Sequence, residues 1–111
     1  MKYGNEPINV NGHTFASKAE ARRYKELLIM EQVGAITSLR LQPKYELIPS
    51  FRKNGRTFRK TEYIADFEYI EDGKIIVEDV KGFKTEVYKL KKKLFEYKYE
   101  TLTLREVKAR K

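Results

Sequence analysis

The spacing of apolar residues changes along the chain, and these changes predict its secondary structure. Between residues 17 and 33, apolar positions recur at the spacing of a helix, at Ala21, Tyr24, Leu27, Leu28 and Met30. The segment begins with Ser17-x-x-Glu20, a capping box, and Gly34 follows it as a suitable residue just past a helix end. The sequence therefore predicts a first helix over residues 17–33.

A second helical period covers residues 85–99. We expect its buried stripe to contain four residues and its margins two aromatic ones, namely Val87, Leu90, Leu94 and Tyr97, with Tyr88 and Phe95. Residues 101–107 then alternate around Leu102 and Leu104, which favours a closing strand. Because a helix precedes this strand, it is able to pair in parallel with an earlier one.

Alternation with a period of two dominates the middle of the chain. Two apolar runs, 63–70 and 74–80, flank Asp72-Gly73, a pair typical of a two-residue hairpin turn in which both central residues need a positive φ. Asn54-Gly55 is a second such pair, and it joins a strand over 39–48 to the strand that carries Asp66. Pro43 predicts an edge strand, a bulge or the entry of that earlier strand.

The Asp72-Gly73 turn also predicts which residues face each other. If these two form the loop, paired residues across the hairpin place Asp66 opposite Asp79, with Lys81 diagonal to Asp66 on the same face. Opposed carboxylates repel each other, and a divalent cation between them removes that repulsion. Two acids, a metal and a lysine on one face suit metal-assisted hydrolysis of a phosphodiester.

Glu78 is the rival of its neighbour Asp79. Strand alternation places Glu78 on the face opposite to Asp66 and Lys81, so we choose Asp79 as the second ligand. A bulge of one residue would exchange the two.

The predicted order is helix, three strands joined by two hairpins, helix, strand. This order indicates an α+β domain with a mixed sheet of about four strands flanked by two helices. One domain accounts for all 111 residues. We expect residues 1–14, apart from a short extended piece at Ile8–Val10, and residues 108–111 to be mobile.

Composition narrows the partners. The net charge of +8 favours a polyanion, most simply nucleic acid. The chain has no cysteine, no signal peptide and no apolar run of membrane-spanning length, so we expect a cytoplasmic protein that does not contact a membrane. His13, the only histidine, lacks a second ligand at metal-binding spacing, and we expect it on the surface.

The cations are unevenly placed. Five of them and no acid surround Asn54-Gly55, which favours an arm that contacts phosphates over a merely solvated loop. Lysines of the second helix form either a solvated face or a phosphate-binding face. The expected DNA-binding residues are Lys18, Arg52, Lys53, Arg56, Arg59, Lys60, Lys84, Lys89, Lys92 and Lys93.

Asp66 followed by Asp79-Val80-Lys81 is similar to the D…(D/E)-x-K signature of the PD-(D/E)XK nuclease superfamily. Within that superfamily the chain resembles a family of small phage-encoded endonuclease-like proteins, and the resemblance covers nearly the whole chain. Ala65 stands where the superfamily name has proline, and Asp79 where glutamate is commoner. The matching blocks are residues 15–20, 41–45, 63–67, 77–82 and 88–95.

The resemblance implies a restriction-endonuclease-like core and a Mg²⁺-dependent DNA endonuclease, in which Mn²⁺ is able to replace Mg²⁺. Its site would contain Glu20, Asp66 and Asp79 as metal ligands and Lys81 as the catalytic lysine. Branched DNA of the Holliday-junction type is one implied substrate, and cutting two strands with one small site would need a homodimer. For Glu20, a helix cap remains the competing explanation.

Two other classes of function remain open. One is a non-catalytic nucleic-acid-binding module that keeps the fold, and the other is a phage structural or interaction protein. Neither needs two acids and a lysine on one face of a hairpin, which is why we favour the nuclease.

Overall fold

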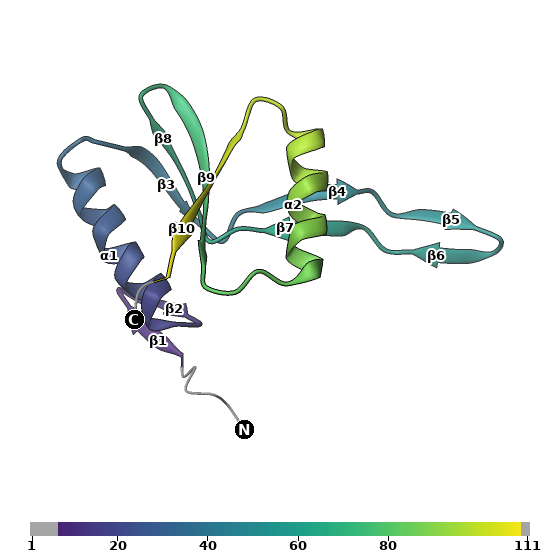
Figure 1. Cartoon of the computed structure of the whole chain (residues 1–111), viewed down its shortest axis with the longest axis horizontal. Helices are drawn as coiled ribbons and strands as arrows, with labels where there is room; N and C mark the ends of the chain where they lie inside the picture. The colour runs from purple at the N-terminus through teal and green to yellow at the C-terminus, as the bar shows by residue number, and fades with distance from the viewer. Residues whose placement is uncertain (1–6, 110–111) are drawn as a thin grey trace.

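The structure is a computed structural model, and it describes residues 7–109. Two helices, α1 (Lys18–Gln32) and α2 (Glu86–Lys98), accompany ten strands (Figure 1). Neither helix in the described part of the chain is long and apolar enough to cross a membrane. The strands are β1 (Ile8–Val10), β2 (His13–Phe15), β3 (Thr37–Leu41), β4 (Lys44–Ile48), β5 (Phe51–Lys53), β6 (Arg56–Phe58), β7 (Thr61–Ile64), β8 (Phe67–Glu71), β9 (Lys74–Lys81) and β10 (Thr103–Lys108).

A four-stranded sheet with the order β10-β9-β8-β3 lies at the centre. β8 is antiparallel to β3 and to β9, whereas β10 is parallel to β9 after the α2 crossover. This confirms the expected α+β class with a mixed four-stranded sheet and two helices. Three further two-stranded sheets, β1-β2, β4-β7 and β5-β6, were not expected as separate units.

Both hairpin turns formed as predicted. Asp72 and Gly73 have φ of 52° and 77°, and Asn54 and Gly55 have φ of 52° and 74°, the positive values that a two-residue turn of this kind requires. The pairing from Glu71↔Lys74 to Phe67↔Glu78 has the predicted register. The next residues beyond this pairing are Asp66, before β8, and Asp79, on β9.

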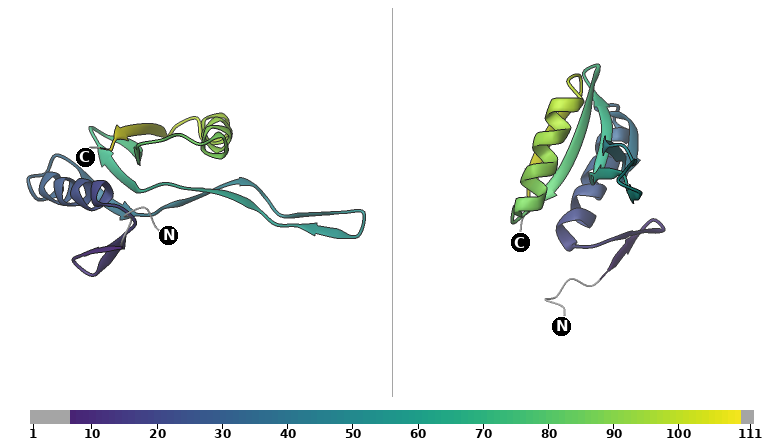
Figure 2. Two further views of the ribbon diagram at one scale, coloured as in Figure 1. Left: turned by 60° about the horizontal axis from the view of Figure 1, so that its bottom comes forward. Right: turned by 90° about the vertical axis from the view of Figure 1, so that its right-hand side faces the viewer.

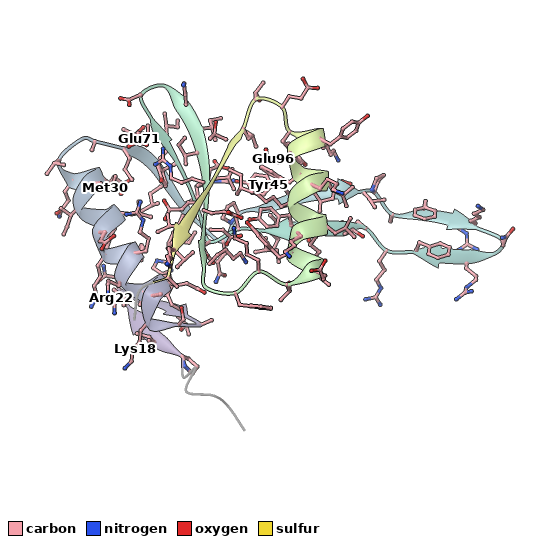
Figure 3. All side chains as sticks on the ribbon, viewed as in Figure 1. Lys18, Arg22, Met30, Tyr45, Glu71 and Glu96 are labelled. Atoms are coloured by element: carbon pink, nitrogen blue, oxygen red, sulfur yellow. The ribbon has the colours of Figure 1, made fainter. Side chains whose placement is uncertain are left out.

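Two hydrophobic cores lie on opposite faces of the sheet. Figure 2 shows α1 on one side of the sheet and α2 on the other. On one face, Tyr24 and Leu27 of α1 pack with Phe67 and Tyr69 of β8. On the other face, α2 packs against the pair β4 and β7, and Tyr45 points toward this helix (Figure 3). Adjacent residues of β9 therefore contribute to different cores.

The buried face of α2 differs from the prediction. Val87, Leu90 and Tyr97 are 63%, 56% and 85% exposed, whereas Tyr88 and Phe95 are buried. The reason is that α2 meets a surface that is itself aromatic: the Phe95 ring lies 5.1 Å from Tyr45 and 5.4 Å from Tyr63. Tyr88 and Phe95 therefore fit this surface, whereas Leu94 is only partly buried beside them.

β3 and β4 form one long ribbon with β7 and β8, and the ribbon bends at residues 42–43 and 65–66. Gln42 N–H donates to the Asp66 carbonyl (2.9 Å), and Ala65 N–H donates to the Pro43 carbonyl (3.1 Å), so hydrogen bonding continues across the bend. The predicted single strand over 39–48 is thus two strands, broken at Pro43. Beyond β4 and β7, strands β5 and β6 project from the body along the longest axis of the molecule (Figure 1).

The N-terminal segment contains more structure than expected. Within residues 7–14, β1 includes the predicted extended piece, and it forms a small hairpin with β2 around Asn11-Gly12. His13 is exposed, as predicted. At the other end, Lys108 belongs to β10. The rest of the segments expected to be mobile, residues 1–6 and 110–111, lies outside the described residues.

Candidate functional site

The ribbon bend brings Asp66 against β9 beside Asp79. Asp66 follows β7 and precedes β8, and its N–H donates to the Glu78 carbonyl (3.1 Å). Val80 N–H in turn donates to Asp66 Oδ2 (2.8 Å). These two bonds fix the Asp66 carboxyl next to that of Asp79, as the hairpin register predicted.

The two carboxyl groups are electrostatically coupled. The pKa of Asp66 is raised far above the usual range of an aspartate, first by burial and then by the negative charge of Asp79 and a hydrogen bond with it. The bond from Val80 N–H acts in the opposite direction, but it is the weaker effect. Without a cation, the pair therefore holds a proton that one isolated aspartate would lose at neutral pH.

Two further side chains contact the carboxylate of Asp79. The Tyr63 hydroxyl donates to Asp79 Oδ2, and Lys81 Nζ lies 3.6 Å from the same oxygen. Lys81 Nζ also lies 3.9 Å from the centre of the Tyr88 ring, a cation–π contact. Asp79 is nearly fully buried and Lys81 is partly exposed, so the lysine forms the solvent side of the site.

Sequence reasoning missed Tyr63 and Tyr88. Tyr63 lies before the ribbon bend, where strand alternation no longer tells which face a side chain takes. Tyr88 was predicted at the margin of the α2 stripe, yet it is buried and its hydroxyl donates to Glu106 Oε2 (2.6 Å). Neither role has a local signal in the sequence, because one depends on the ribbon bend and the other on the packing of α2.

Glu20 lies in the first turn of α1. Its backbone N–H donates to Ser17 Oγ (3.2 Å), so the predicted N-cap is formed. Its pKa is raised, first by burial and also by the charge of Asp79, while a hydrogen bond with the Ala16 backbone and the charge of Lys81 lower it. The structure thus gives Glu20 both a capping contact and an electrostatic link to the site.

The three acids do not form a ready-made cage. Across residues 7–109, no three histidine, cysteine or acidic side chains converge closely enough to hold a metal ion. Asp66 and Asp79 form the close pair, and the charge of Glu20 reaches them at longer range. The alternative ligand, Glu78, is held elsewhere.

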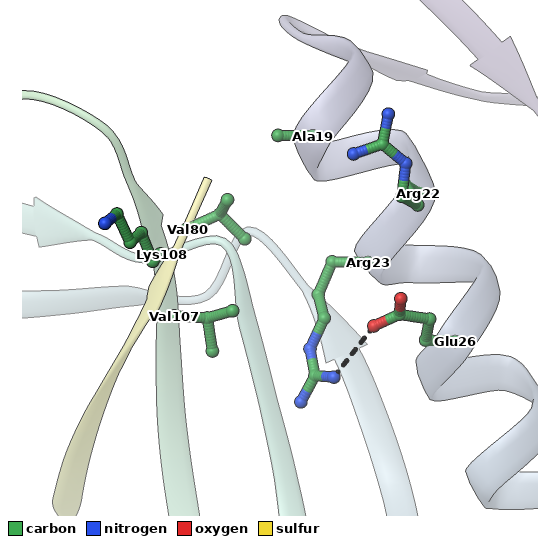
Figure 4. Close-up of a pocket in the computed structure, with 7 residues that line it drawn as sticks. All are labelled: Ala19, Arg22, Arg23, Glu26, Val80, Val107 and Lys108. Carbon is green, nitrogen blue, oxygen red and sulfur yellow. Dashed lines mark hydrogen bonds and ion pairs between the residues drawn. The ribbon is translucent and has the colours of Figure 1, made fainter. Parts of the chain in front are cut away.

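Glu78 lies on the opposite face of β9, as strand alternation predicted. It is fully buried, and Arg23 of α1 contacts both of its oxygens, through Nε (2.7 Å) and Nη2 (3.0 Å). Tyr69 also donates to it. Figure 4 shows Arg23 between α1 and the strands β9 and β10, with its second ion pair to Glu26 (3.0 Å). Since Arg23 lies one turn after Glu20, this contact holds α1 against the strand that carries Asp79.

The expected DNA-binding cations divide into two groups. Lys84, Lys89 and Lys92 form ion pairs with Glu106 (2.9 Å), Glu86 (3.2 Å) and Glu96 (3.4 Å), and Lys60 pairs with Glu62 (3.2 Å). Lys53, Arg56 and Arg59 have no acidic partner among the described residues, and Arg52 bonds only to neutral groups. Lys93 is exposed on α2, and Lys18 is exposed at the start of α1 (Figure 3). Among the described residues, the largest group of expected DNA-binding cations without an acidic partner thus lies on and next to the β5-β6 arm.

A protein-family model matches the chain over residues 1–111, and its description is "Protein of unknown function (DUF1064)". The chain belongs to this family. No curated protein and no solved structure matches it. The description of the DUF1064 family names no activity.

Proposed function

We propose that the protein is a metal-dependent DNA endonuclease with a restriction-endonuclease-like core, acting in the cytoplasm of a bacterial cell. The observation that supports this best is the pairing of half-buried Asp66 with buried Asp79, because burial and then the charge of Asp79 raise the pKa of Asp66 enough for the pair to retain a proton. A protein under selection only for stability gains nothing from this arrangement, because it costs free energy unless a cation neutralises it.

The donor set fits a hard divalent cation such as Mg²⁺ or Mn²⁺. Asp66 and Asp79 would hold it, with Glu20 as a third carboxylate, and cations of this kind take carboxylate oxygens and retain several waters. A bound ion would supply an acidified water and charge stabilisation at the phosphate. The bond from Val80 N–H orients Asp66 for this role, and the bond from Tyr63 orients Asp79.

Lys81 would act on the attacking water and on the scissile phosphate. Its ammonium lies at the solvent side of Asp79, where it can orient a water or offset developing negative charge. The contact with the Tyr88 ring keeps this flexible side chain in place. The unpaired cations of the β5-β6 arm would hold the DNA backbone.

A nuclease assay tests the proposal directly. The protein is incubated with linear duplex, single-stranded and branched DNA, each with Mg²⁺, Mn²⁺ or EDTA, and cleavage is followed on denaturing gels. We expect cleavage with either metal and none with EDTA, and loss of cleavage in Asp79→Asn. A homodimer, measured by sedimentation, is expected only if both strands or a junction are cut in one event.

The second candidate is a DNA-binding module without catalysis. The absence of a three-acid cage in residues 7–109 and the existing contacts of Asp79 with Tyr63 and Lys81 favour it. Titration calorimetry with Mn²⁺ separates the two functions. Binding that is lost in Asp66→Asn supports the nuclease, whereas DNA binding without any metal binding supports the module.

A further inference from the structure

The β5-β6 arm has two chemically different faces. Its pairing is Phe51↔Phe58, Arg52↔Thr57 and Lys53↔Arg56 around the Asn54-Gly55 turn. Because alternate residues of a strand share a face, the Phe51/Phe58 pair and the Lys53/Arg56 pair lie on one side. Arg52 and Thr57 lie on the other side, and they bond to each other (2.7 Å).

The first side presents flat aromatic surface to solvent. Phe51 and Phe58 stack with ring centres 4.8 Å apart and planes 11° from parallel, and they remain 46% and 40% exposed. The Arg56 guanidinium lies 5.9 Å from the centre of the Phe58 ring. We call this surface, made of Phe51, Lys53, Arg56 and Phe58, the aromatic face of the arm.

A purely structural role explains only part of the aromatic face. Cross-strand aromatic pairs stabilise a ribbon by about 0.2–1 kcal/mol, and this arm lies outside both cores, so it benefits from one. However, an exposed apolar pair at the end of a projecting arm is also a contact surface. The unpaired cations on the same face indicate that its partner is anionic.

The partner has to combine negative charge with flat apolar groups, and nucleic acid does so. In a duplex, each base is covered by its neighbours, so a phenylalanine ring reaches a base face only after unstacking it, at a cost of about a few kcal/mol. An unpaired base offers its face freely, and stacking on an aromatic side chain stabilises it whatever its identity.

We propose that the aromatic face binds unpaired nucleotides, with bases stacked on the Phe51/Phe58 pair and phosphates on Lys53 and Arg56. The inference rests on the proposed function in one respect, namely that DNA is the partner, and it narrows the substrate to DNA with single-stranded or unpaired segments. The arm would then select the DNA structure, while the acidic pair would act on the phosphodiester.

Binding is measured in EDTA, so that cleavage plays no part. The probes are a labelled oligothymidine of about 15 nucleotides and a mixed-sequence duplex of the same length, followed by fluorescence anisotropy. The test variant is Phe51→Leu/Phe58→Leu, which keeps an apolar cross-strand contact but removes the flat rings. The matched control is Tyr97→Leu, which removes an exposed aromatic ring on α2.

We expect the arm variant to lose roughly tenfold or more in affinity for the oligothymidine. Its affinity for the duplex should change by less than about twofold, and the control should match wild type. No loss, or an equal loss on both probes, would overturn the inference. A wild-type dimer that becomes a monomer in the arm variant, without loss of oligothymidine binding, would also overturn it.

A fluorescent-reporter variant gives a second test that does not depend on loss of binding. The chain has no tryptophan, so Phe58→Trp introduces a single fluorescent reporter, with Tyr97→Trp as its control. Oligothymidine should quench the first reporter and not the second, and quenching of neither would contradict stacking. If wild type binds no DNA at all, the inference and the proposed function fail together. If wild type cleaves DNA while both arm tests are negative, only the inference fails.

Discussion

Arg23 on α1 and Glu78 on β9 form an ion pair with two hydrogen bonds, although 55 positions separate them in the sequence. This ion pair lies on the face of β9 opposite to Asp79. The Glu78 carboxylate is fully buried, and Arg23 is its cationic partner. Removing Arg23 leaves that charge without compensation.

We therefore expect Arg23→Ala to lower the free energy of unfolding by about 3–5 kcal/mol, measured by urea denaturation. Arg40→Ala is the matched control, because Arg40 forms an ion pair with Glu68 (2.9 Å) but is 57% exposed. Its loss should cost about 0–1 kcal/mol. Equal effects of the two substitutions would show that the Arg23–Glu78 pair is no more than a surface contact.

The Asp79→Asn variant should lose cleavage and keep its fold. The amide oxygen can still accept from Tyr63, and the repulsion with Asp66 disappears, so thermal stability without metal should hold or rise. Asp72→Asn is the control, since it converts one favourable turn pair into another on an exposed loop. Cleavage at the wild-type rate in Asp79→Asn would remove this residue from the mechanism.

Stability without metal should depend on pH through Asp66. Its pKa is raised to about 8 by burial and by Asp79, so between about pH 4 and pH 8 the folded chain holds a proton that the unfolded chain has lost. The contribution is present at the acidic end of this window and is lost as pH rises through the folded pKa. Urea denaturation in EDTA should show stability falling across the window in wild type.

Glu20 and Glu106 also have shifted pKa values, raised and lowered respectively, so they add to the pH dependence of stability. The Asp66→Asn variant isolates the contribution of Asp66. The free energy of unfolding of wild type should fall relative to that of Asp66→Asn as pH rises. Adding Mg²⁺ should reduce the pH dependence of wild type. A difference that stays constant with pH would mean that the pKa of Asp66 is not raised in the folded chain.

Glu20→Gln separates the two roles of Glu20. Gln keeps a side-chain acceptor for the helix start but removes the charge that a strong metal ligand needs. We expect stability near wild type and a fall in cleavage by orders of magnitude, partly recovered with Mn²⁺. Ser17→Ala is the complementary change: it removes the bond to Glu20 N–H, at a cost of about 0.5–2 kcal/mol, and should lower stability more than turnover. Full activity in Glu20→Gln would restrict the site to Asp66, Asp79 and Lys81.

DNA affinity should fall steeply with salt, at a slope near −0.9 per phosphate neutralised on duplex DNA. Reversing the charges of Arg56 and Arg59 should reduce that slope, since neither has an acidic partner to release. Reversing Lys89 and Lys92 should reduce it less, because each already pairs with a glutamate of α2. Affinity that does not change with salt would contradict a phosphate-binding role for either group.

The hairpin was predictable because its turn is encoded locally. Asp72-Gly73 sets the register, and the register places Asp66 beside Asp79 and Glu78 on the other face. Contacts across the ribbon bend were not predictable, because strand alternation stops at Ala65 and because the packing of α2 against β4 and β7 is not encoded locally. This is why Tyr63 was missed as the partner of Asp79. The same limit applies to α2, where two apolar rows lie side by side and only the aromatic surface of β4 and β7 selects between them.

The position of the β5-β6 arm outside both cores has an evolutionary consequence. Substitutions in the arm remove no core contact, so selection can act on them with only a small penalty in stability. The arm can therefore diverge faster than the body that carries Asp66 and Asp79. Relatives should then differ most between residues 51 and 58, and exchanging this segment between them should transfer the preference for a DNA structure while leaving the melting temperature in place.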